Sequence, residues 1–436
     1  MRVLVIGLGV TGSAVVDFAR AAGHEVTVIE DQASTGAFRA RAERAIAAGA
    51  TVIEAPGAGT TATRAASADI VVPSPGVHPD HPAIVAARHA GASLRSEVDI
   101  AVEALRHRAD APRLVAVTGT NGKTTVTTLI AEMLAASGIR ATAAGNIGRP
   151  LIEAAFDDVG VVVAEVSSFQ LEFTTDAFAP DVAVLLNVAV DHIDWHGSRE
   201  AYAAAKAKVF AHQQADQVFV VNVDDPVAAD LAATARSRVV EVSAPDESHD
   251  ESHDQANARI ASAAATAAGA HAAGIAAALE TFQNLPHRLQ LVAEIDGVRY
   301  YDDSKATNAH ATASALRGFD RVVLIAGGRN RSQDLDRLRS AAARVRAVIA
   351  IGESAADVER VFTDAGITVV RAMSMHDAVN AAATRAMPGD AVLLSPACAS
   401  LDWYDDYAAR GDDFAREVEL LRPITRGPFT NEQVHS

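Results

Sequence analysis

Val115-Ala-Val-Thr-Gly119-Thr-Asn-Gly122-Lys123-Thr124-Thr125 is the stretch around which the chain is organised. The apolar residues that open it predict a buried strand, and residues 126–135 predict the helix that follows the glycine-bracketed loop. Glycines let a backbone approach an anion, and the free N–H groups at a helix start point toward it. Lys123 can then reach terminal phosphates, and the Thr124 hydroxyl can bind Mg²⁺. The stretch predicts a nucleoside-triphosphate site, although the general phosphate-loop pattern has glycine at position 117.

Size and charge narrow the class of protein. The chain has 436 residues, 49% of them hydrophobic and 21% charged, which is enough for two to four domains. A formal net charge of −17 argues against nucleic acid as a partner, because phosphate backbones require a basic face. No apolar run reaches membrane-span length, and Met1-Arg2 leads directly into the strand predicted over 3–6, without a signal-peptide cleavage region. Cys398 is the single cysteine, so we expect a cytoplasmic enzyme without an intramolecular disulfide.

A second glycine pattern, Gly7-x-Gly9-x-x-Gly12, opens the chain between a strand and a helix. The next strand, 25–29, ends at Glu30, which completes a βαβ nucleotide-binding fingerprint. Alone it indicates a dinucleotide dehydrogenase, but the same geometry holds any nucleotide pyrophosphate. Pro73-Ser74-Pro75-Gly76 follows another strand at an edge where ligands gather in α/β sheets, although Ser74 and Gly76 also suit an ordinary turn.

Polar residues follow the strands of the middle segment. Gly145-Asn146-Ile147-Gly148 is typical of an anion-binding loop, and Glu165 ends strand 159–164, where a carboxylate beside a phosphate loop suits Mg²⁺. His192 follows strand 181–186 and is by composition either a metal ligand or a hydrogen-bonding residue. Helix 202–210 carries Lys206 and Lys208, which by themselves read as exposed lysines. Residues 246–254 repeat Glu-Ser-His-Asp, which favours a flexible acidic loop over metal capture.

The last third of the chain alternates strands and helices again. Asp296-Gly297 predicts a hairpin turn between strands 290–295 and 298–301. Polar segments follow later strands, at Asp302–Asn308, Gly327–Arg331 and Ser395–Asp402. With linkers near residues 109–112 and 284–288, we predict three α/β domains: a Rossmann-like domain over 1–110, a central phosphate-loop ATPase domain with a mostly parallel sheet over 111–284, and a Rossmann-like domain over 285–436.

This set of motifs resembles the Mur ligase family nearly from end to end. Gly119-Thr-Asn-Gly-Lys-Thr-Thr125 is that family's form of the phosphate loop, which accounts for Val117. Asp303-Ser-Lys-Ala-Thr-Asn308 and Ser395-Pro-Ala-Cys-Ala-Ser-Leu-Asp402 are its specific signals, and the second favours the glutamate-adding member.

The resemblance implies an ATP- and Mg²⁺-dependent ligase of peptidoglycan precursor synthesis, acting as a monomer. ATP would phosphorylate the carboxylate of UDP-N-acetylmuramoyl-L-alanine, and the amine of glutamate would displace the phosphate. D-Glutamate is favoured, but L-glutamate or another amino acid stays open as an alternative, as does, in a different class, an NAD-dependent oxidoreductase.

The resemblance also implies roles for individual residues. Lys123, His192 and Lys206 are the catalytic candidates, and Lys206, not Lys208, matches the lysine that relatives carbamylate, which would make it an oxygen ligand. The ATP-binding candidates are Gly119, Thr120, Asn121, Gly122, Lys123, Thr124, Thr125, Asn257, Arg288 and Asp303. The substrate-binding candidates are Gly9, Val10, Thr11, Gly12, Ser74, Gly76, Asn146, Ser167, Gln170, Lys305, Thr307, Arg331, Ser400, Leu401 and Tyr407. The metal-binding candidates are Thr124, Glu165, His192 and Lys206.

Three positions depart from the family pattern. The Gly-x-His-Asn segment beside the adenine is replaced by the Glu-Ser-His-Asp repeat, with His253 and Asn257 as possible remnants. Arg331, in Gly327–Arg331, stands for a lysine expected near the side-chain carboxylate of the amino acid, which keeps the charge but changes its reach. Gln32 replaces an arginine that often helps hold the uridine.

Overall fold

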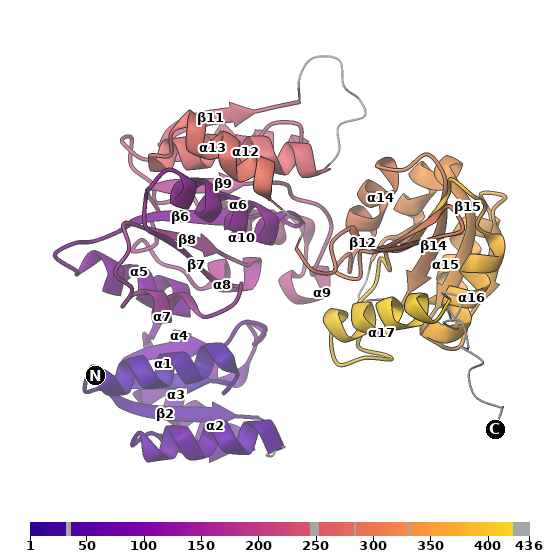
Figure 1. The fold of residues 1–436 in the computed structure, drawn as a ribbon. Coiled ribbons are helices and arrows are strands. Elements are labelled where there is room, and N and C mark those ends of the chain that lie inside the picture. Colours follow the sequence, from indigo (N-terminus) through magenta and orange to yellow (C-terminus); the bar gives the residue numbers. More distant parts are fainter. Residues whose placement is uncertain (32–35, 245–252, 283–284, 331–332, 422–436) are drawn as a thin grey trace, which may run out of the picture. The chain divides into compact units, whose positions relative to one another are not determined.

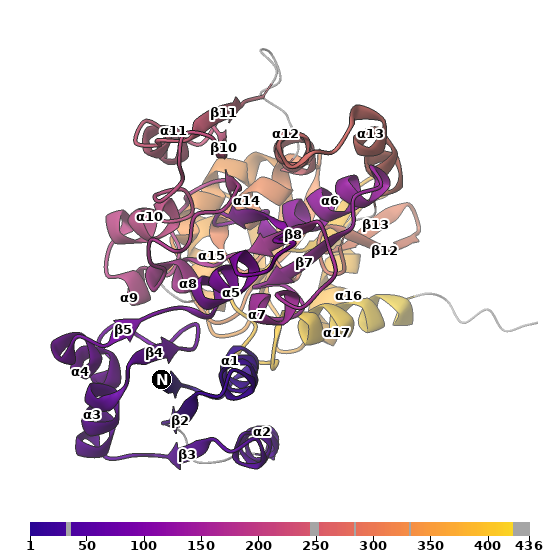
Figure 2. The same cartoon turned by 90° about the vertical axis from the view of Figure 1, so that its left-hand side faces the viewer.

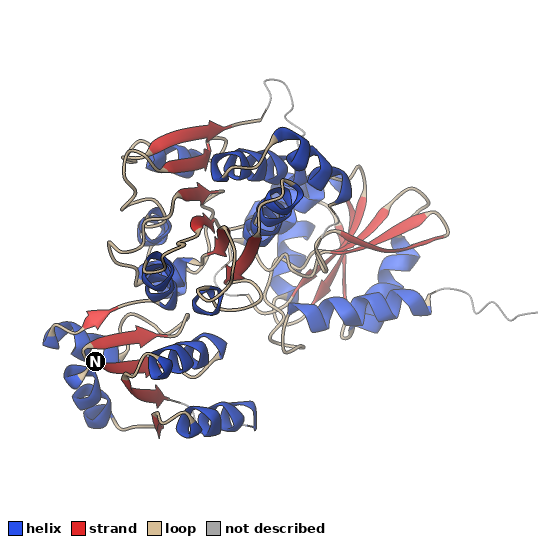
Figure 3. Cartoon of the chain, turned by 60° about the vertical axis from the view of Figure 1, so that its left-hand side comes forward, coloured by secondary structure: helices blue, strands red, loops and turns tan. Residues whose placement is uncertain are grey.

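The computed structural model describes residues 1–31, 36–244, 253–282, 285–330 and 333–421, and it divides into two compact units, 1–282 and 283–436. The described residues form three α/β domains, whose sheets have five, six and six strands, as the alternation of elements predicts (Figure 1). In each, helices flank a central sheet (Figure 3). Gln32, Arg331 and most of the Glu-Ser-His-Asp repeat lie outside the described residues. The three domain boundaries stay a prediction.

The first sheet of unit 1 is wholly parallel, with the order β3-β2-β1-β4-β5. Its strands are β1 (Arg2–Ile6), β2 (Glu25–Glu30), β3 (Thr51–Glu54), β4 (Ile70–Pro73) and β5 (Ser93–Leu94). Its helices are α1 (Val10–Ala21), α2 (Gly36–Ala47), α3 (Ala58–Ser67), α4 (Pro82–Ala90) and α5 (Glu97–Arg106). The turns after β1 and β4 lie at the same edge, because parallel strands share the edge at which they end.

The second sheet is also parallel, with the order β11-β10-β9-β6-β8-β7. Its strands are β6 (Arg113–Thr118), β7 (Ala141–Gly145), β8 (Val161–Glu165), β9 (Val182–Leu185), β10 (Val218–Asn222) and β11 (Arg238–Val242). The helices are α6 (Lys123–Ala136), α7 (Leu151–Ala154), α8 (Ser168–Glu172), α9 (Ile193–His196), α10 (Arg199–Ala207), α11 (Pro226–Ala232), α12 (His253–Ala268) and α13 (Ala272–Thr281). Figure 2 shows α6, α12 and α13 near one another.

Both faces of this second sheet are buried, which explains the near-continuous apolar runs of its strands. In β6, Leu114 and Ala116 pack into one apolar cluster, with α5 and α7, while Val115 and Val117 pack into the other, under α6 and α12. A valine at position 117 therefore fills the core beneath the phosphate loop.

Side chains cap two helices of unit 1, and the first of these caps corrects a predicted helix start. The helix predicted from 202 begins at Arg199, because the Ser198 hydroxyl accepts a hydrogen bond from the N–H of Ala201 at 3.0 Å. Helix α13 begins at Ala272, where the His271 ring accepts a hydrogen bond from the N–H of Gly274 at 3.0 Å. Side-chain capping therefore places both starts.

Unit 2 holds one sheet with the order β12-β13-β17-β14-β15-β16, parallel except for the hairpin β12–β13. The hairpin is confirmed: Asp296 and Gly297 both have positive φ, 51° and 77°. The strands are β12 (Gln290–Ile295), β13 (Val298–Asp302), β14 (Val322–Gly327), β15 (Val345–Ile351), β16 (Thr368–Arg371) and β17 (Ala391–Leu394). The helices are α14 (Ala309–Arg317), the 3₁₀ helix Leu335–Arg344, α15 (Ala355–Thr363), α16 (Met375–Arg385) and α17 (Tyr407–Leu420).

Candidate functional site

The phosphate loop joins β6 to α6 as predicted, but the helix begins at Lys123, three residues before its predicted start at 126. Gly122 has φ 84°, and a Cβ there would lie 2.5 Å from the side-chain oxygen of Asn257. Only glycine therefore fits this position, and Asn257 is placed directly against the loop. The Lys123 ammonium donates to the carbonyls of Gly119 and Thr120, at 2.8 and 2.9 Å. The loop thus brings a cation and a helix start together, which is an arrangement that binds phosphate.

Asn187 and Tyr202 hold this loop in shape, and the sequence reasoning missed both roles. The backbone oxygen of Asn187 accepts from the N–H of Thr120, and its side-chain oxygen accepts from the N–H of Asn121, both at 2.9 Å. The Tyr202 hydroxyl lies 3.0 Å from the Thr120 hydroxyl. Burial raises the pKa of Tyr202, so this hydroxyl stays protonated. The end of β9 and helix α10 therefore support the loop.

Lys206 is fully buried against the phosphate loop, with 1% of its surface exposed. Its Nζ donates to the backbone oxygen of Gly119 at 2.8 Å, the same oxygen that Lys123 contacts. Burial lowers the pKa of Lys206 well below its usual value, and the charge of Lys123 lowers it further. A lowered pKa favours the neutral amine, which is the form that reacts with CO₂. Lys208, in contrast, donates to the backbone oxygen of Glu172 at 2.6 Å.

Glu165 ends β8 and pairs in register with Val117 on one side and Gly145 on the other. It is buried, with 2% exposure, and its Oε1 accepts from the side-chain amide of Asn146 at 2.8 Å. Its Oε2 is buried without a hydrogen-bond partner. A buried carboxylate oxygen without a donor is costly unless a cation or ligand meets it, so this residue fits a Mg²⁺ ligand.

A metal here would need a mixed set of ligands. Within the described ranges, no three His, Cys, Asp or Glu side chains gather closely enough to hold a metal ion. The predicted set of Thr124, Glu165, His192 and Lys206 contains only two residues of those types. A hydroxyl and a carbamylated lysine would supply the oxygen ligands that Mg²⁺ prefers.

His192 has a left-handed backbone, with φ 53°, and stands at the start of α9. Its ring packs on Phe169, with centroids 4.7 Å apart, and its Nε2 lies 3.6 Å from a carboxylate oxygen of Asp191. Burial lowers the pKa of His192 and outweighs the opposing charge of Asp191, while Lys206 and Lys123 lower it further. The neutral imidazole that results is the form able to bind a metal or accept a proton.

Two of the predicted substrate residues form the first turn of α8. The Ser167 hydroxyl accepts from the N–H of Gln170 at 3.2 Å, and the Gln170 side-chain oxygen accepts from the N–H of Ser167 at 2.9 Å. This is a capping box, which fixes the side-chain oxygen of Gln170 toward Ser167. The neighbouring carboxyl of Glu97, the first residue of α5, interacts with the Gln170 amide and accepts from the N–H of Ile152 at 2.6 Å.

Glu97 predicts a measurable pH dependence of stability. Burial raises the pKa of Glu97 to about 7. Between its unfolded pKa near 4.5 and about 7, the folded protein holds a proton that the unfolded chain has lost, so stability falls as pH rises. Glutamine does not titrate, so we expect the free energy of unfolding of Glu97→Gln to rise relative to that of the wild type across this window. The rise should be at most about 1.4 kcal/mol per pH unit. Thermal unfolding midpoints from pH 5 to 8 test this; parallel curves for the two proteins would contradict it.

The predicted uridine-binding residues lie at the edge where β1 and β4 end. The Ser74 hydroxyl donates to the backbone oxygen of Gly7 at 2.8 Å, and a Cβ on Gly12 would lie 2.1 Å from that same oxygen. Glycine at position 12 is thus required by the close approach of loop and helix. Glu30 accepts from the N–H of Leu8 at 2.9 Å, so the acidic residue of the fingerprint helps close the loop. Gly9 and Gly76 lie in the same two turns, and Val10 and Thr11 are the first residues of α1.

Unit 2 brings most of its predicted residues together at the carboxyl ends of β13 and β17. Asp303 follows β13 and accepts from the Ser395 hydroxyl at 2.8 Å, and burial raises the pKa of Asp303 to about 7. The charge of Arg288 opposes that rise. The Lys305 ammonium lies 5.1 Å from the centre of the Tyr407 ring. Thr307 lies in the segment 303–308 that follows β13, and Ser400 and Leu401 lie in the segment 395–402 that follows β17. Arg331 is outside the described residues.

Arg410 joins these segments, and no motif indicated it. It is 1% exposed, and its guanidinium donates to the Ser304 hydroxyl at 2.9 Å, to the Ser304 carbonyl at 2.7 Å and to the Cys398 carbonyl at 3.1 Å. Burial lowers the pKa of Arg410 to about 10. A single buried cation on α17 therefore connects the Asp303–Asn308 segment to the Ser395–Asp402 segment.

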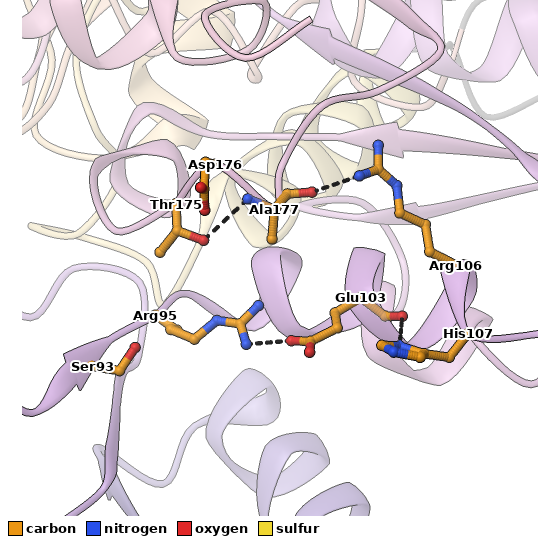
Figure 4. Close-up of a pocket in the computed structure, with 8 residues that line it drawn as sticks. All are labelled: Ser93, Arg95, Glu103, Arg106, His107, Thr175, Asp176 and Ala177. Atoms are coloured by element: carbon orange, nitrogen blue, oxygen red, sulfur yellow. Dashed lines mark hydrogen bonds and ion pairs between the residues drawn. The ribbon is translucent and has the colours of Figure 1, made fainter.

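A separate pocket of unit 1 contains none of the predicted residues (Figure 4). Its volume is about 370 Å³, and Arg95 and Arg106 lie on its wall. Arg95 is paired with Asp99 and Glu103, and Arg106 donates to the Ala177 carbonyl at 3.1 Å. Because the protein itself engages both guanidinium groups, this pocket carries no part of the predicted chemistry.

Comparison with known proteins identifies the same family along most of the chain. Residues 1–96 match a Mur ligase MurD-like N-terminal domain, 117–274 the Mur ligase middle domain, and 287–398 the Mur ligase glutamate ligase domain. In the described part of the chain, no helix is both long and apolar enough to cross a membrane.

Individual relatives agree with these matches. The UDP-N-acetylmuramoylalanine–D-glutamate ligase of Desulfatibacillum aliphaticivorans is 39% identical, over 96% of this chain and 98% of its own. The UDP-N-acetylmuramoylalanine–D-glutamate ligase of Frankia casuarinae is 41% identical, over 96% of this chain and 94% of its own. A pseudomurein peptide ligase type C from Methanothermus fervidus has the same fold, with TM-score 0.59 and 16% identity over 97% of this chain and 100% of its own. The chain therefore belongs to the Mur ligase family, in the group of the UDP-N-acetylmuramoylalanine–D-glutamate ligases.

Proposed function

We propose that this protein is an ATP-dependent ligase that adds D-glutamate to UDP-N-acetylmuramoyl-L-alanine in peptidoglycan precursor synthesis. The relatives that match nearly its whole length bear the name of this activity. The observation that carries the proposal is the phosphate loop with Lys123, Lys206 and Glu165 in place, because a ligase that passes through an acyl phosphate needs such a loop beside a site for a cation.

The first step transfers the terminal phosphoryl group of ATP to the carboxylate of the UDP-linked substrate. ADP leaves, and an acyl phosphate forms. The N–H groups at the start of α6 and the Lys123 ammonium are the groups that would hold the ATP phosphates, since both present positive charge at the same loop. Asn257, placed against Gly122, would lie beside the nucleotide.

Mg²⁺, when bound, offsets the charge of the two anions that must meet, and Thr124, Glu165, His192 and a carbamylated Lys206 are the residues that would hold it. The buried, unpartnered Oε2 of Glu165 supports this assignment. Ser167, Gln170 and Asn146 would orient the precursor.

The second step joins the amino acid to the acyl phosphate. The amine of D-glutamate attacks the acyl carbon, the bond from carbon to the phosphate oxygen breaks, and the amine loses a proton. Lys305, Thr307, Ser400, Leu401, Tyr407 and Arg331 are the residues proposed to receive the glutamate. Arg410 would keep two of these segments in register. A monomeric state and a cytoplasmic location are further proposals, and both rest on the family resemblance.

The test is phosphate release from ATP with Mg²⁺ and UDP-N-acetylmuramoyl-L-alanine, with D-glutamate and L-glutamate supplied separately. We expect release with D-glutamate and none with L-glutamate or without an amino acid. Release with L-glutamate alone would overturn the stereochemistry but keep the mechanism. No release with either, also with other nucleoside triphosphates, would overturn the proposed activity.

A further inference from the structure

Trp195 connects two parts of unit 1 that lie far apart in the sequence. Its indole N–H donates to the backbone oxygen of Gly76, 119 residues away, at 3.2 Å. Gly76 has φ 94° and belongs to the exposed turn that follows β4. Trp195 belongs to α9, three residues after His192. One hydrogen bond thus joins the predicted uridine turn to the helix that begins at a predicted metal ligand.

The backbone of α9 ties the indole closely to His192. The N–H groups of Trp195 and His196 both donate to the backbone oxygen of His192, at 3.1 and 3.0 Å. The helix has a single turn that ends at His196, and Gly197, with φ 81°, caps it. Because no further turns absorb a displacement, a shift of Trp195 is carried to His192.

A cluster of rings fixes the direction of the indole. Phe169 of α8 lies 4.8 Å from Trp195 in an edge-to-face contact, 4.7 Å from His192 and 5.7 Å from His196 in a stacked one. His78, two residues beyond Gly76, also makes an edge-to-face contact with Trp195, at 5.9 Å. Pairs of this kind have preferred geometries, so the cluster holds the N–H toward the turn.

We propose that Trp195 is a positioning residue that couples binding of the uridine end of the substrate, at the Ser74–Gly76 turn, to the placement of His192 at the reacting end. The inference rests on the proposed function, which assigns the two ends of one substrate to these two places. A turn that is already ordered by the indole loses less conformational entropy when the substrate binds. The same hydrogen bond transmits any movement of the turn to α9.

Kinetics of Trp195→Phe test the positioning role, because phenylalanine keeps an aromatic ring but removes the N–H. We expect the KM for UDP-N-acetylmuramoyl-L-alanine to rise about fivefold, the effect of one lost hydrogen bond, while the KM values for ATP and D-glutamate stay within about twofold. Trp403→Phe is the matched control, since it makes the same change in unit 2, and there the KM for the UDP-linked substrate should not change. A merely structural role would instead alter all three KM values and lower the unfolding midpoint; that result, or an unchanged KM for the UDP-linked substrate, would overturn the proposal.

Fluorescence tests the coupling without relying on turnover. The chain has two tryptophans, so in Trp403→Phe the emission comes from Trp195 alone. Titration with UDP should give a saturable change in emission, because the indole N–H lies on the turn that UDP would occupy. A protein that binds UDP by calorimetry with no change in Trp195 emission would contradict the inference. If the wild type released no phosphate with D-glutamate yet Trp403→Phe showed this emission change with UDP, the proposed function would fail and the coupling would stand.

Discussion

Replacement of Lys206 by alanine is expected to lower kcat by about a thousandfold while the protein stays folded. The reason is the position of the Lys206 amine beside the phosphate loop. It is buried, it lies 2.8 Å from the backbone oxygen of Gly119, and burial and Lys123 together lower its pKa. A neutral amine at this point can take up CO₂ and become a carboxylate-like oxygen ligand beside the phosphate loop. Alanine would leave that position without any ligand.

Steady-state phosphate release measures the loss, and Lys208→Ala is the matched control. Lys208 lies two residues away in the sequence, but its Nζ contacts the backbone oxygen and the carboxylate of Glu172, at 2.6 and 3.4 Å. Its loss should change kcat by no more than about twofold, as is usual for a partly exposed ion pair. Formate or acetate should restore part of the activity of Lys206→Ala, since either supplies the missing carboxylate. Full activity of Lys206→Ala, or equal losses in the two variants, would remove Lys206 from the site.

Features that depend on a short stretch of backbone could be predicted from the sequence. The phosphate loop and the Asp296-Gly297 hairpin are examples, because each is determined by glycines and by the strands or helix next to them. The three α/β domains with mostly parallel sheets could be predicted in the same way, from the alternation of strands and helices. The order of the strands within each sheet did not follow, since it is set by which faces pack together.

Features that depend on contacts between distant residues could not be predicted. Arg410 reads as an ordinary arginine on a surface helix, and only the fold shows that its guanidinium reaches Ser304 and Cys398. Asn187 and Tyr202 carry no motif, yet they support the phosphate loop from two other elements. The family resemblance indicated which residues matter in the site, but not what holds them in place.

Replacement of Glu165 by glutamine should abolish most activity while leaving the metal-free protein at least as stable as the wild type. Glutamine can keep the hydrogen bond from Asn146, because its side-chain oxygen can take the place of Oε1. It puts a neutral NH₂ group where the buried Oε2 has no partner. An uncompensated buried charge is destabilising, so its removal should not lower the unfolding midpoint and can raise it. The same change removes a negative oxygen ligand, which should lower kcat by about a hundredfold or more.

Two measurements distinguish a role of Glu165 in binding the cation from a purely structural role. Thermal unfolding with and without Mg²⁺ and ATP should show that the ligands raise the midpoint of the wild type more than that of Glu165→Gln, because only the wild type keeps the carboxylate that binds the cation. Glu172→Gln is the matched control: it removes a half-buried acid of α8 that pairs with Lys208, and it should retain both activity and ligand stabilisation. If Glu165→Gln instead unfolded at a markedly lower temperature without ligands, the carboxylate would be holding the strand end in place, and its assignment to the cation would fail.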